Sequence, residues 1–425
     1  MGTVIIILLL VLIALAGAPL FTIIGAIGLL AFSAAGTDTS ALIVELYRLV
    51  DFPALIAIPL FTFSGYLLAE SQAPRRLIHL AEALFGWMPG GLAVVALFST
   101  AIFTAFSGAS GVTIIALGGL IYPALIKQNY PAGFSLGLMT TSGSLGLLFP
   151  PSLPIILYSI VASVNIDKLF LAGLIPGIVL LVILSAYSIR VGLVAQVPRT
   201  LFRWNNVWNA LKESAWEAPL PVVVIGGIYG GVFTATEAAA VTAVYVLVVE
   251  VFIQREIKFS VGLPRVIRES MILVGAILVM LGASMGVTSY VIDEQIPMKL
   301  FAFISLYVSS KVVFLMILNL FILVMNMVEI FSAIIIVVPI IVPVALQYGV
   351  DPVHLGIIFL LNLEIGYMTP PLGLNLFLSS LRFGKPLTEV YRTVLPFFAL
   401  LLAVLLLITY FPQLSLALTS AVGAH

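Results

Sequence analysis

Long runs of apolar residues follow one another along the whole chain, and they constrain its fold more than any other feature. The runs lie at about 3–34, 53–71, 169–190, 217–233, 236–253, 270–292 and 393–411. A helix of about 20 apolar residues is long enough to cross the hydrocarbon core of a bilayer. Only 8% of the residues are charged, against roughly 25% in soluble domains. The sequence therefore predicts an all-α polytopic protein that lies in the lipid bilayer.

Composition and short motifs argue against several classes of function. The 18 basic and 18 acidic residues cancel, so no charge excess points to nucleic acid. Cysteine is absent, which excludes disulfides, thiol catalysis and iron–sulfur clusters. His79, His354 and His425 are scattered, which argues against a zinc site. No HExxH, GxSxG or GxxxxGKS/T motif occurs, and we expect no catalytic residues and no enzyme.

The stretch GSLGLLFPPSLPIILY, residues 143–158, interrupts an apolar region with two adjacent prolines. Proline removes a backbone donor and clashes with the preceding turn of a helix. Within lipid an unsatisfied backbone group costs several kcal/mol, so broken helices are tolerated where they line a cavity. Pro150 and Pro151 therefore predict a broken membrane helix at about 132–160 with a functional role.

Two short apolar segments precede this break. Residues 92–106 and 112–126 would each form roughly 22 Å of helix, which is less than the roughly 30 Å of a hydrocarbon core. Between them lies FSGASG, residues 106–111, a turn of small residues. We therefore predict a re-entrant helical hairpin at about 90–127, which enters and leaves the membrane on one side.

The same landmarks recur further along the chain. Pro370 follows Pro150 by 370 − 150 = 220 residues, and the same offset relates Gly366 to Gly146, Pro343 to Pro123 and Pro396 to Pro176. Four landmarks at one offset indicate an internal duplication, with repeats at 53–190 and 270–411. The second repeat should then contain a hairpin at about 311–347 and a broken helix at about 353–380.

The remaining segments flank or connect the repeats. We expect scaffold helices at 1–52, a connector with an amphipathic helix and two membrane helices at 191–269, and a tail at 412–425. Basic residues concentrate in 72–80, 190–216 and 254–270, which we assign to the cytoplasmic side. The two repeats then begin by crossing the membrane in opposite directions. Inverted-topology repeats that meet near the midplane are typical of secondary transporters.

Each predicted break offers uncharged oxygen atoms that could bind a cation. In the first repeat they belong to the hydroxyls of Ser107 and Ser110 and to the carbonyls near Gly146, Phe149 and Pro151. In the second repeat they come from Gly366, Thr369 and Leu372. Hard oxygen ligands without formal charge suit Na⁺ better than a transition metal. The alternative is that Gly and Ser only allow close helix packing, but the duplicated breaks favour sodium sites. Ser135 and Thr113 should lie outside them.

Three acidic residues interrupt apolar segments, and a carboxylate within the membrane is by default a functional hypothesis. Glu237 follows a predicted helix start, and we favour a structural role there, facing the helix dipole. Glu329 falls at the tip of the second hairpin, and we favour a role in the site. For Glu364, two residues before Gly366, both roles stay open. Arg48 is either a partner contact or a solvated charge.

Five stretches of the sequence resemble a known family of transporters. They are AIPLFTFSGYLLAES, GGLAVVALFSTAIFTAFSGASGVT, PPSLPIILYSIVAS, GVFTATEAAAV and IGYMTPPLGLNLFL. Over about residues 5–411 the chain resembles the large membrane subunit, of the DctM type, of tripartite ATP-independent periplasmic (TRAP) transporters. The resemblance implies an elevator-type transporter in the bacterial inner membrane that imports an organic acid with Na⁺. It also implies two partners, a small four-helix membrane subunit and a soluble periplasmic binding protein, and we expect the small subunit to be a separate chain.

The resemblance also implies roles for individual residues. The first sodium site of the family maps onto Ser107, Ser110, Gly146, Phe149 and Pro151, and the second onto Met325, Gly366, Thr369 and Leu372. Ser152 resembles a substrate-facing position, and we assign Ser110 and Glu329 to the same substrate site. The family often has Gly where Met325 stands and Asp where Glu329 stands, so the second hairpin departs from the pattern.

Two other functions stay open at this point. An ion or solute channel is the first alternative, although opposed breaks favour alternating access over a continuous pore. An intramembrane enzyme is the second, and it lacks an evident pair of nucleophile and base. The sequence does not name the organic acid, which could be a dicarboxylate, a sugar acid, a keto acid or a sulfonate.

Overall fold

The computed structural model describes residues 9–10, 12–13, 18–36, 38–198, 201–325, 330–371 and 373–422, and this part of the chain contains helices and no strands. Six helical segments in it are long and apolar enough to cross a membrane. They are Pro53–Glu70, Ile166–Val194, Ala235–Ile253, Gly262–Asp293, Ile330–Gln347 and Leu387–Tyr410. Five coincide with predicted apolar runs, and the sixth is one arm of the second predicted hairpin. The predicted all-α membrane fold is confirmed.

In the two other apolar runs the longest described helices are shorter than the runs themselves. In the N-terminal run, α2 (Leu20–Ala34) begins directly after Pro19, where proline is compatible with a helix start. The run at 217–233 contains α13 (Leu220–Tyr229), whose 10 residues are too few to cross a bilayer. Gly230 and Gly231 follow its last residue, and Gly231 has a φ of +69°, which ends the helix.

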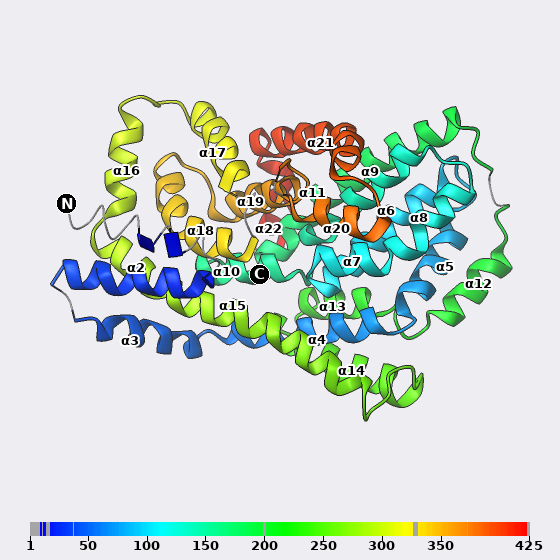
Figure 1. Ribbon diagram of the computed structural model, residues 1–425, viewed down its shortest axis with the longest axis horizontal. Coiled ribbons are helices and arrows are strands. Elements are labelled where there is room, and N and C mark those ends of the chain that lie inside the picture. The colour runs from blue at the N-terminus through cyan, green and yellow to red at the C-terminus, as the bar shows by residue number, and fades with distance from the viewer. Residues whose placement is uncertain are drawn as a thin grey trace.

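One layer of the molecule is built around the longest helix, α15 (Gly262–Asp293), which has 32 residues. The helices α2, α3 (Ser40–Arg48) and α4 (Ala57–Glu70) pack against α15, and α14 (Ala235–Leu247) packs against α4. Figure 1 shows these helices as an elongated layer along the lower edge, with most other helices above them. This layer joins segments from the N-terminus, the connector and the starts of both repeats.

The first repeat forms the predicted hairpin and broken helix. The hairpin consists of α6 (Gly91–Ser107), α7 (Ser110–Ala116) and α8 (Gly118–Lys127), with a bend of 48° between α7 and α8. The broken helix consists of α9 (Ala132–Ser142), the 3₁₀ turn η3 (Leu145–Leu148) and α10 (Leu153–Val161), with a bend of 46° at the break. An unbroken helix, α11 (Ile166–Val194), completes the repeat.

The second repeat has the same order of elements. Its helices are α17 (Lys311–Met325), α18 (Ile330–Gln347), α19 (Pro352–Gly366), α20 (Leu374–Phe383) and α21 (Leu387–Tyr410). The first residue of α17 follows that of α6 by 311 − 91 = 220 residues, and that of α19 follows that of α9 by 352 − 132 = 220 residues. The duplication inferred from Gly and Pro is therefore also present in the helix boundaries.

The two repeats exchange contacts across the centre of the molecule. The second half of the first broken helix, α10, packs against α18 of the second hairpin, and α20 packs against α7 of the first hairpin. In the same way α21 packs against α9, and α11 packs against α19. Each hairpin thus lies beside the broken helix of the other repeat, which brings both breaks to the centre of the fold. The division of the chain into functional domains around these repeats stays a prediction.

Four further helices pack against these elements or against each other. They are α5 (Ala73–Phe85) and α12 (Trp204–Glu213), which pack against each other, α16 (Ile296–Ser305), which packs against α18, and α22 (Gln413–Val422), which packs against α11. The π-helical turn η4 (Val248–Ile253) continues α14 toward the loop before α15.

Candidate functional site

The tip of the first hairpin is buried and carries a row of hydroxyl groups. Gly108 has a φ of +65°, which lets the chain reverse between Ser107 and Ser110, both 1% exposed. The hydroxyl oxygen of Thr113 lies 3.5 Å from that of Ser107 and 2.7 Å from that of Thr104. Thr113 therefore lies inside the cluster, and its predicted place outside it is wrong. The reason is that α7 begins at Ser110, so that residue 113 falls on the same helical face one turn later.

The first break lies against this tip. The Thr104 hydroxyl donates a hydrogen bond of 2.9 Å to the carbonyl of Gly143. Gly146 is so close to α6 that a Cβ added there would lie 2.5 Å from the Cβ of Thr104. Only glycine fits such a close approach of two backbones. In the first repeat the hairpin tip thus faces the break, as predicted.

The backbone of the first break is partly satisfied by local hydrogen bonds. The amide of Phe149 donates to the carbonyl of Gly146, and the amide of Ser152 donates to the carbonyl of Phe149, each at 3.1 Å. A carbonyl oxygen has two lone pairs, so both of these oxygens can accept a further ligand. Pro151 and Ser152 are buried, and the Ser152 hydroxyl has no hydrogen-bond partner among the described residues.

Residues of the second repeat complete this region. Ser110 donates a hydrogen bond of 2.8 Å to the side-chain oxygen of Asn375 on α20, and the Asn375 amide donates to the carbonyl of Thr140 at 3.2 Å. Thr141, next in sequence, donates to the sulfur of Met368 in the second break at 3.6 Å. These contacts hold the two breaks side by side. We call the cluster of Ser107, Ser110, Thr113, Thr140 and Asn375 the polar centre.

The second break offers fewer described contacts. The Thr369 hydroxyl donates to the carbonyl of Ile365 at 2.8 Å, and its amide donates to the carbonyl of Gly366 at 3.1 Å. Met325 is half-buried at the end of α17, which packs against α19. Leu372 and Glu329, both predicted site residues, lie outside the described residues.

The oxygen atoms gathered here fit a monovalent cation better than a transition metal. They belong to hydroxyls, carbonyls and an amide, none of which is charged, and such hard ligands suit Na⁺. A hydroxyl that donates a hydrogen bond keeps its lone pairs for a cation, which holds for Ser110 and Thr369. Among the described residues no group of three or more His, Cys, Asp or Glu side chains could hold a metal ion.

Glu237 has the structural position that the sequence favours. It is exposed at the start of α14 and forms a capping box with Thr234. The Thr234 amide donates to the Glu237 carboxylate at 2.8 Å, and the Glu237 amide donates to the Thr234 hydroxyl at 3.3 Å. Two backbone donors at the helix start are thereby satisfied.

Arg48 lies away from the polar centre. It is exposed, and it lines a cavity of about 300 Å³ between α3, α10, α15 and α18. Hydroxyl-bearing residues, including Ser284 and Thr288, line the same cavity. The cavity separates the layer around α15 from helices of the two repeats, so an arginine at this position can attract an anion or contact a partner.

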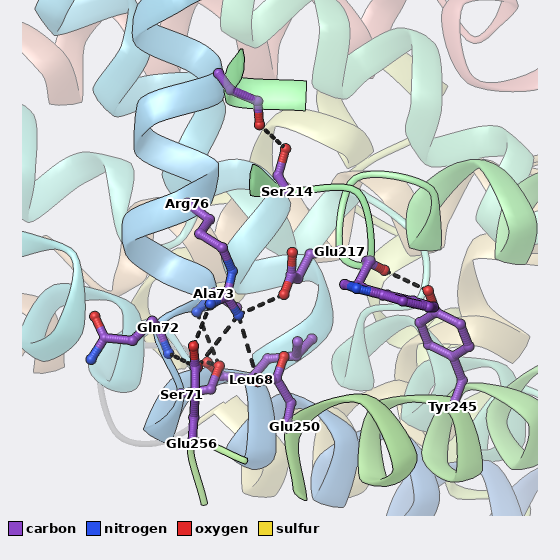
Figure 2. A network of polar contacts seen from close by, with 12 residues as sticks. Leu68, Ser71, Gln72, Ala73, Arg76, Ser214, Glu217, Tyr245, Glu250 and Glu256 are labelled. Atoms are coloured by element: carbon purple, nitrogen blue, oxygen red, sulfur yellow. Dashed lines mark hydrogen bonds and ion pairs between the residues drawn. The ribbon is translucent and has the colours of Figure 1, made fainter. Parts of the chain in front are cut away.

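A second polar cluster, drawn in Figure 2, joins α5 to the segments before α13 and after α14. Arg76 on α5 is 2.6 Å from the Glu217 carboxylate, 3.6 Å from that of Glu250, and also pairs with Glu256. Glu256 accepts a further hydrogen bond of 2.7 Å from the amide of Gln72. Burial lowers the pKa of Arg76, but hydrogen bonds with Glu256 and Glu217 outweigh burial and raise it above its ordinary value. We call Arg76, Glu217, Glu250 and Glu256 the Arg76 cluster.

This cluster connects three parts of the chain that the sequence assigns to one side of the membrane. Arg76 belongs to the basic segment 72–80, Glu217 follows the basic segment 190–216, and Glu256 lies in the basic segment 254–270. His79 also contacts Glu213, with 3.3 Å between Nδ1 and the carboxylate. The loops therefore lie together on one face, in agreement with the charge bias.

Sequence analysis missed several of these residues. Thr104, Thr140 and Asn375 were not singled out, although Asn375 is an amide in the otherwise apolar stretch GLNLFL. A polar side chain in an apolar membrane segment is itself a signal, because it needs a hydrogen-bond partner there. The partner of Asn375 is 265 residues away, at Ser110, and local spacing does not reveal it.

The sequence matches known proteins over most of its length. The family described as tripartite ATP-independent periplasmic transporter, DctM component, matches residues 4–414. The C4-dicarboxylate TRAP transporter large permease protein DctM of Pseudomonas aeruginosa is 36% identical over 401 residues, which cover 94% of this chain and 93% of that protein. The isethionate TRAP transporter permease protein DctMQ of Oleidesulfovibrio alaskensis is 33% identical over 405 residues, or 94% of this chain and 63% of that protein.

A solved structure shares the fold. The crystal structure of the Alcanivorax borkumensis YdaH transporter, described as having an unusual topology, matches with a TM-score of 0.60 and covers 88% of each chain. At 15% identity this likeness concerns the fold alone. The family match, in contrast, spans nearly the whole chain. The chain therefore belongs to the DctM family of tripartite ATP-independent periplasmic transporters, and it is a multi-pass permease subunit of the bacterial inner membrane and not an enzyme.

Proposed function

We propose that this permease subunit imports an organic acid and couples the import to Na⁺. The observation that carries the proposal is the convergence of uncharged oxygen atoms where the first hairpin tip meets the two breaks. In the proposal, Ser107, Ser110, Gly146, Phe149 and Pro151 supply the first sodium site. The second consists of Met325, Gly366, Thr369 and Leu372.

The contacts of these residues support a cation rather than a purely structural cluster. Within the described part of the chain the Ser107 hydroxyl makes only long hydrogen bonds of 3.5 Å, so its oxygen is weakly engaged. The carbonyls of Gly146 and Phe149 each keep an acceptor position. A close-packing role for Gly and Ser would not require hydroxyls and free carbonyl lone pairs at the same place.

We further propose that the two repeats have inverted topology and move as an elevator. The equal offset of the helix boundaries and the exchanged packing, α10 with α18 and α20 with α7, support a pseudo-two-fold relation. In this scheme the hairpins and broken helices carry the bound solute, and the layer around α15 remains fixed in the membrane.

The substrate is proposed to be an organic anion held by Ser110, Ser152 and Glu329. The relatives named above are described as transporting a C4-dicarboxylate and isethionate, which are both organic acids. Ser152 supports the proposal because its buried hydroxyl lacks a partner among the described residues. A small four-helix membrane subunit and a periplasmic binding protein would act with this chain, and Arg48 is the proposed contact for a partner.

The test is uptake into proteoliposomes that contain this chain and both partner proteins. Candidate organic acids are first identified by mass spectrometry of the ligand that the binding protein carries. We expect uptake against a concentration gradient that requires an inward sodium gradient and both partners. Uptake that only dissipates a gradient would indicate a channel, and full uptake by this chain without the binding protein would contradict the tripartite assignment.

A further inference from the structure

All four tryptophans of the chain lie on or beside two short helices, α5 and α12. Trp87 follows α5, Trp204 and Trp208 belong to α12, and Trp216 follows α12. All four are exposed, Trp204 by 76% and Trp208 by 60%. Figure 1 shows α5 and α12 at one end of the molecule and α16 at the opposite end. Exposed apolar side chains gathered in one place mark an interaction surface, and the proposed sodium and substrate sites use none of these tryptophans.

The exposed aromatic side chains form a continuous band. The ring centroid of Phe202 lies 6.3 Å from that of Trp87 and 5.2 Å from that of Trp204, and both pairs meet edge to face. On α12, Trp208 follows Trp204 by four residues and Leu211 comes three residues later, so these side chains lie on one helical face. Leu211 is also exposed. We call Trp87, Phe202, Trp204, Trp208 and Leu211 the aromatic band.

The helix α12 buries a different face in the protein. Val207 and Ala210 are buried, and α12 packs against α5. Trp204 and Trp208 lie on an adjacent face, turned from the buried one by roughly a quarter of a turn. Asn205, an exposed polar residue, lies on the far side of the aromatic face. A helix with an exposed aromatic face beside a polar one has the pattern of a helix that lies in a membrane interface.

Basic residues accompany the aromatic band. The segment 190–216 contains four basic residues and one acidic residue. Arg203 is exposed and directly precedes Trp204, and the Lys212 ammonium group lies 5.4 Å from the ring centre of Trp208. Long basic side chains at a membrane interface extend toward phosphate groups while aromatic rings stay at the boundary with the acyl chains. The charges next to the band are therefore complementary to lipid phosphates.

A pocket between α5 and α12 lies beside the band and narrows the choice of lipid. It has a volume of about 290 Å³, and Trp87 and Phe202 are part of its lining. Its lining also contains groups of both charge signs, which are the basic side chains of His79 and Arg203 and the acidic side chains of Glu82 and Glu213. A headgroup that carries both a phosphate and an ammonium group fits this surface better than a purely anionic one.

We propose that the aromatic band docks into the headgroup layer of the bilayer, with zwitterionic phospholipids as its partner. The side is the one that the basic segments mark as cytoplasmic. The preceding helix α11 has 29 residues, or roughly 43 Å, which exceeds the roughly 30 Å of the hydrocarbon core. Its end therefore extends into the headgroup layer, where α12 follows. The proposal uses the membrane location of the chain and does not depend on sodium-coupled transport.

Tryptophan fluorescence of the full chain in phosphatidylcholine vesicles tests the docking, because every tryptophan of the chain lies in this region. Bromine atoms on the lipid acyl chains quench only nearby rings. An interfacial helix reaches about 5–10 Å into the boundary, so bromines near the headgroup should quench about twice as strongly as bromines near the chain end. Equal emission in brominated and ordinary vesicles would mean that water or protein covers the band, and it would overturn the proposal.

A conservative double variant assigns the signal to α12. Trp204→Phe with Trp208→Phe keeps two aromatic rings on the exposed face and removes only their fluorescence, so the fold should survive. The quenched share of the remaining emission should fall. If that share is unchanged, the signal belongs to Trp87 and Trp216, and α12 is not docked in the headgroup layer.

Spin labels then distinguish lipid from a covering protein. The chain has no cysteine, so a single introduced cysteine can be labelled alone. A label at Trp208→Cys should be more accessible to oxygen, which partitions into lipid, than to a water-soluble nickel chelate. The matched control is Asn205→Cys on the polar side of the same helix, where this order should reverse. Equal accessibility at both positions would overturn the proposal. A band label shielded from both reagents after assembly with the partner proteins would also overturn it, since a protein would then cover the band.

Discussion

The Arg76 cluster and the polar centre both bury oxygen atoms, but they compensate them in different ways. In the Arg76 cluster one guanidinium faces three carboxylates, and Glu250 is 0% exposed. In the polar centre the oxygens are uncharged and satisfy one another through single hydrogen bonds such as that from Ser110 to Asn375. The first arrangement resists opening because opening would break several charge-assisted hydrogen bonds and ion pairs of Arg76 at once. The second can exchange a hydrogen bond for a cation at small cost.

By this difference, the Arg76 cluster is a fixed connection between elements, whereas the contacts of the polar centre can change. The Arg76 cluster joins α5 to the segments that precede α13 and follow α14, as Figure 2 shows. The polar centre lies between the repeats, where the proposed sodium site would bind and release its ion. Variants of the first region should change stability, and variants of the second should change sodium dependence.

The largest effect is expected from Arg76→Met. This variant leaves Glu217 and Glu250, both almost fully buried, without their cation. Removing one partner of a buried ion pair typically costs about 3–5 kcal/mol of folding free energy. The measurement is the midpoint of thermal unfolding in detergent, which should fall markedly for Arg76→Met.

The matched control for this variant is Arg75→Met. Arg75 is the preceding residue on α5 and is exposed, so its loss should have little effect on the midpoint. Equal midpoints for the two variants would show that the Arg76 cluster does not stabilise the packing of α5 against the segments around α13 and α14. The contrast with the polar centre would then not hold.

A smaller effect, confined to sodium dependence, is expected from Ser110→Ala. The variant removes the hydroxyl of a buried residue but keeps a small side chain. We expect the sodium concentration for half-maximal uptake to rise about tenfold, which corresponds to about 1.4 kcal/mol. The loss of its hydrogen bond to Asn375 should cost a further 1 kcal/mol or so of stability, roughly the value of one neutral hydrogen bond.

Ser135→Ala is the matched control for Ser110→Ala. Ser135 is also fully buried, and its hydroxyl donates to the carbonyl of Pro131 at 3.1 Å, outside the polar centre. The control should therefore lose a similar hydrogen bond without changing sodium dependence. If both variants shift the sodium curve equally, the assignment of Ser110 to a sodium site is wrong.

The fold could be predicted from sequence further than the site could. Membrane helices, hairpin and broken helices follow from apolar runs and from proline pairs, because these features act locally on the backbone. The 220-residue offset extended this reasoning from one repeat to the other. Contacts between distant segments were not accessible in this way. Asn375 meets Ser110, and Arg76 meets Glu256, only because the chain folds back over itself.

Thr113 shows the same limit on a smaller scale. Its place in the polar centre depends on where α7 begins, and a shift of that start by one residue would turn Thr113 to another face. Helix starts within a small-residue turn such as FSGASG are not fixed by apolar periodicity. The structure supplies that boundary, and it places Thr113 in the polar centre.

A more modest change is expected from Thr369→Val. Thr369 is half-buried and its hydroxyl donates to Ile365, so a cation there would share an oxygen that is already engaged. We expect the sodium concentration for half-maximal uptake to rise about threefold, or about 0.6 kcal/mol. An unchanged curve would mean that sodium dependence comes from the first repeat alone. A larger shift than that of Ser110→Ala would mean that the second repeat contributes more to sodium dependence than the first.

The smallest effect is expected from Glu237→Gln. Glu237 is an acid in an apolar stretch, as Glu364 and Glu250 are, but it is exposed and serves a capping box with Thr234. Glutamine can replace glutamate in a capping box, because its side-chain oxygen also accepts from the backbone amide of the cap residue. Both the unfolding midpoint and the sodium curve should therefore match those of wild type. A shifted sodium curve would mean that an exposed acid outside both polar regions takes part in coupling.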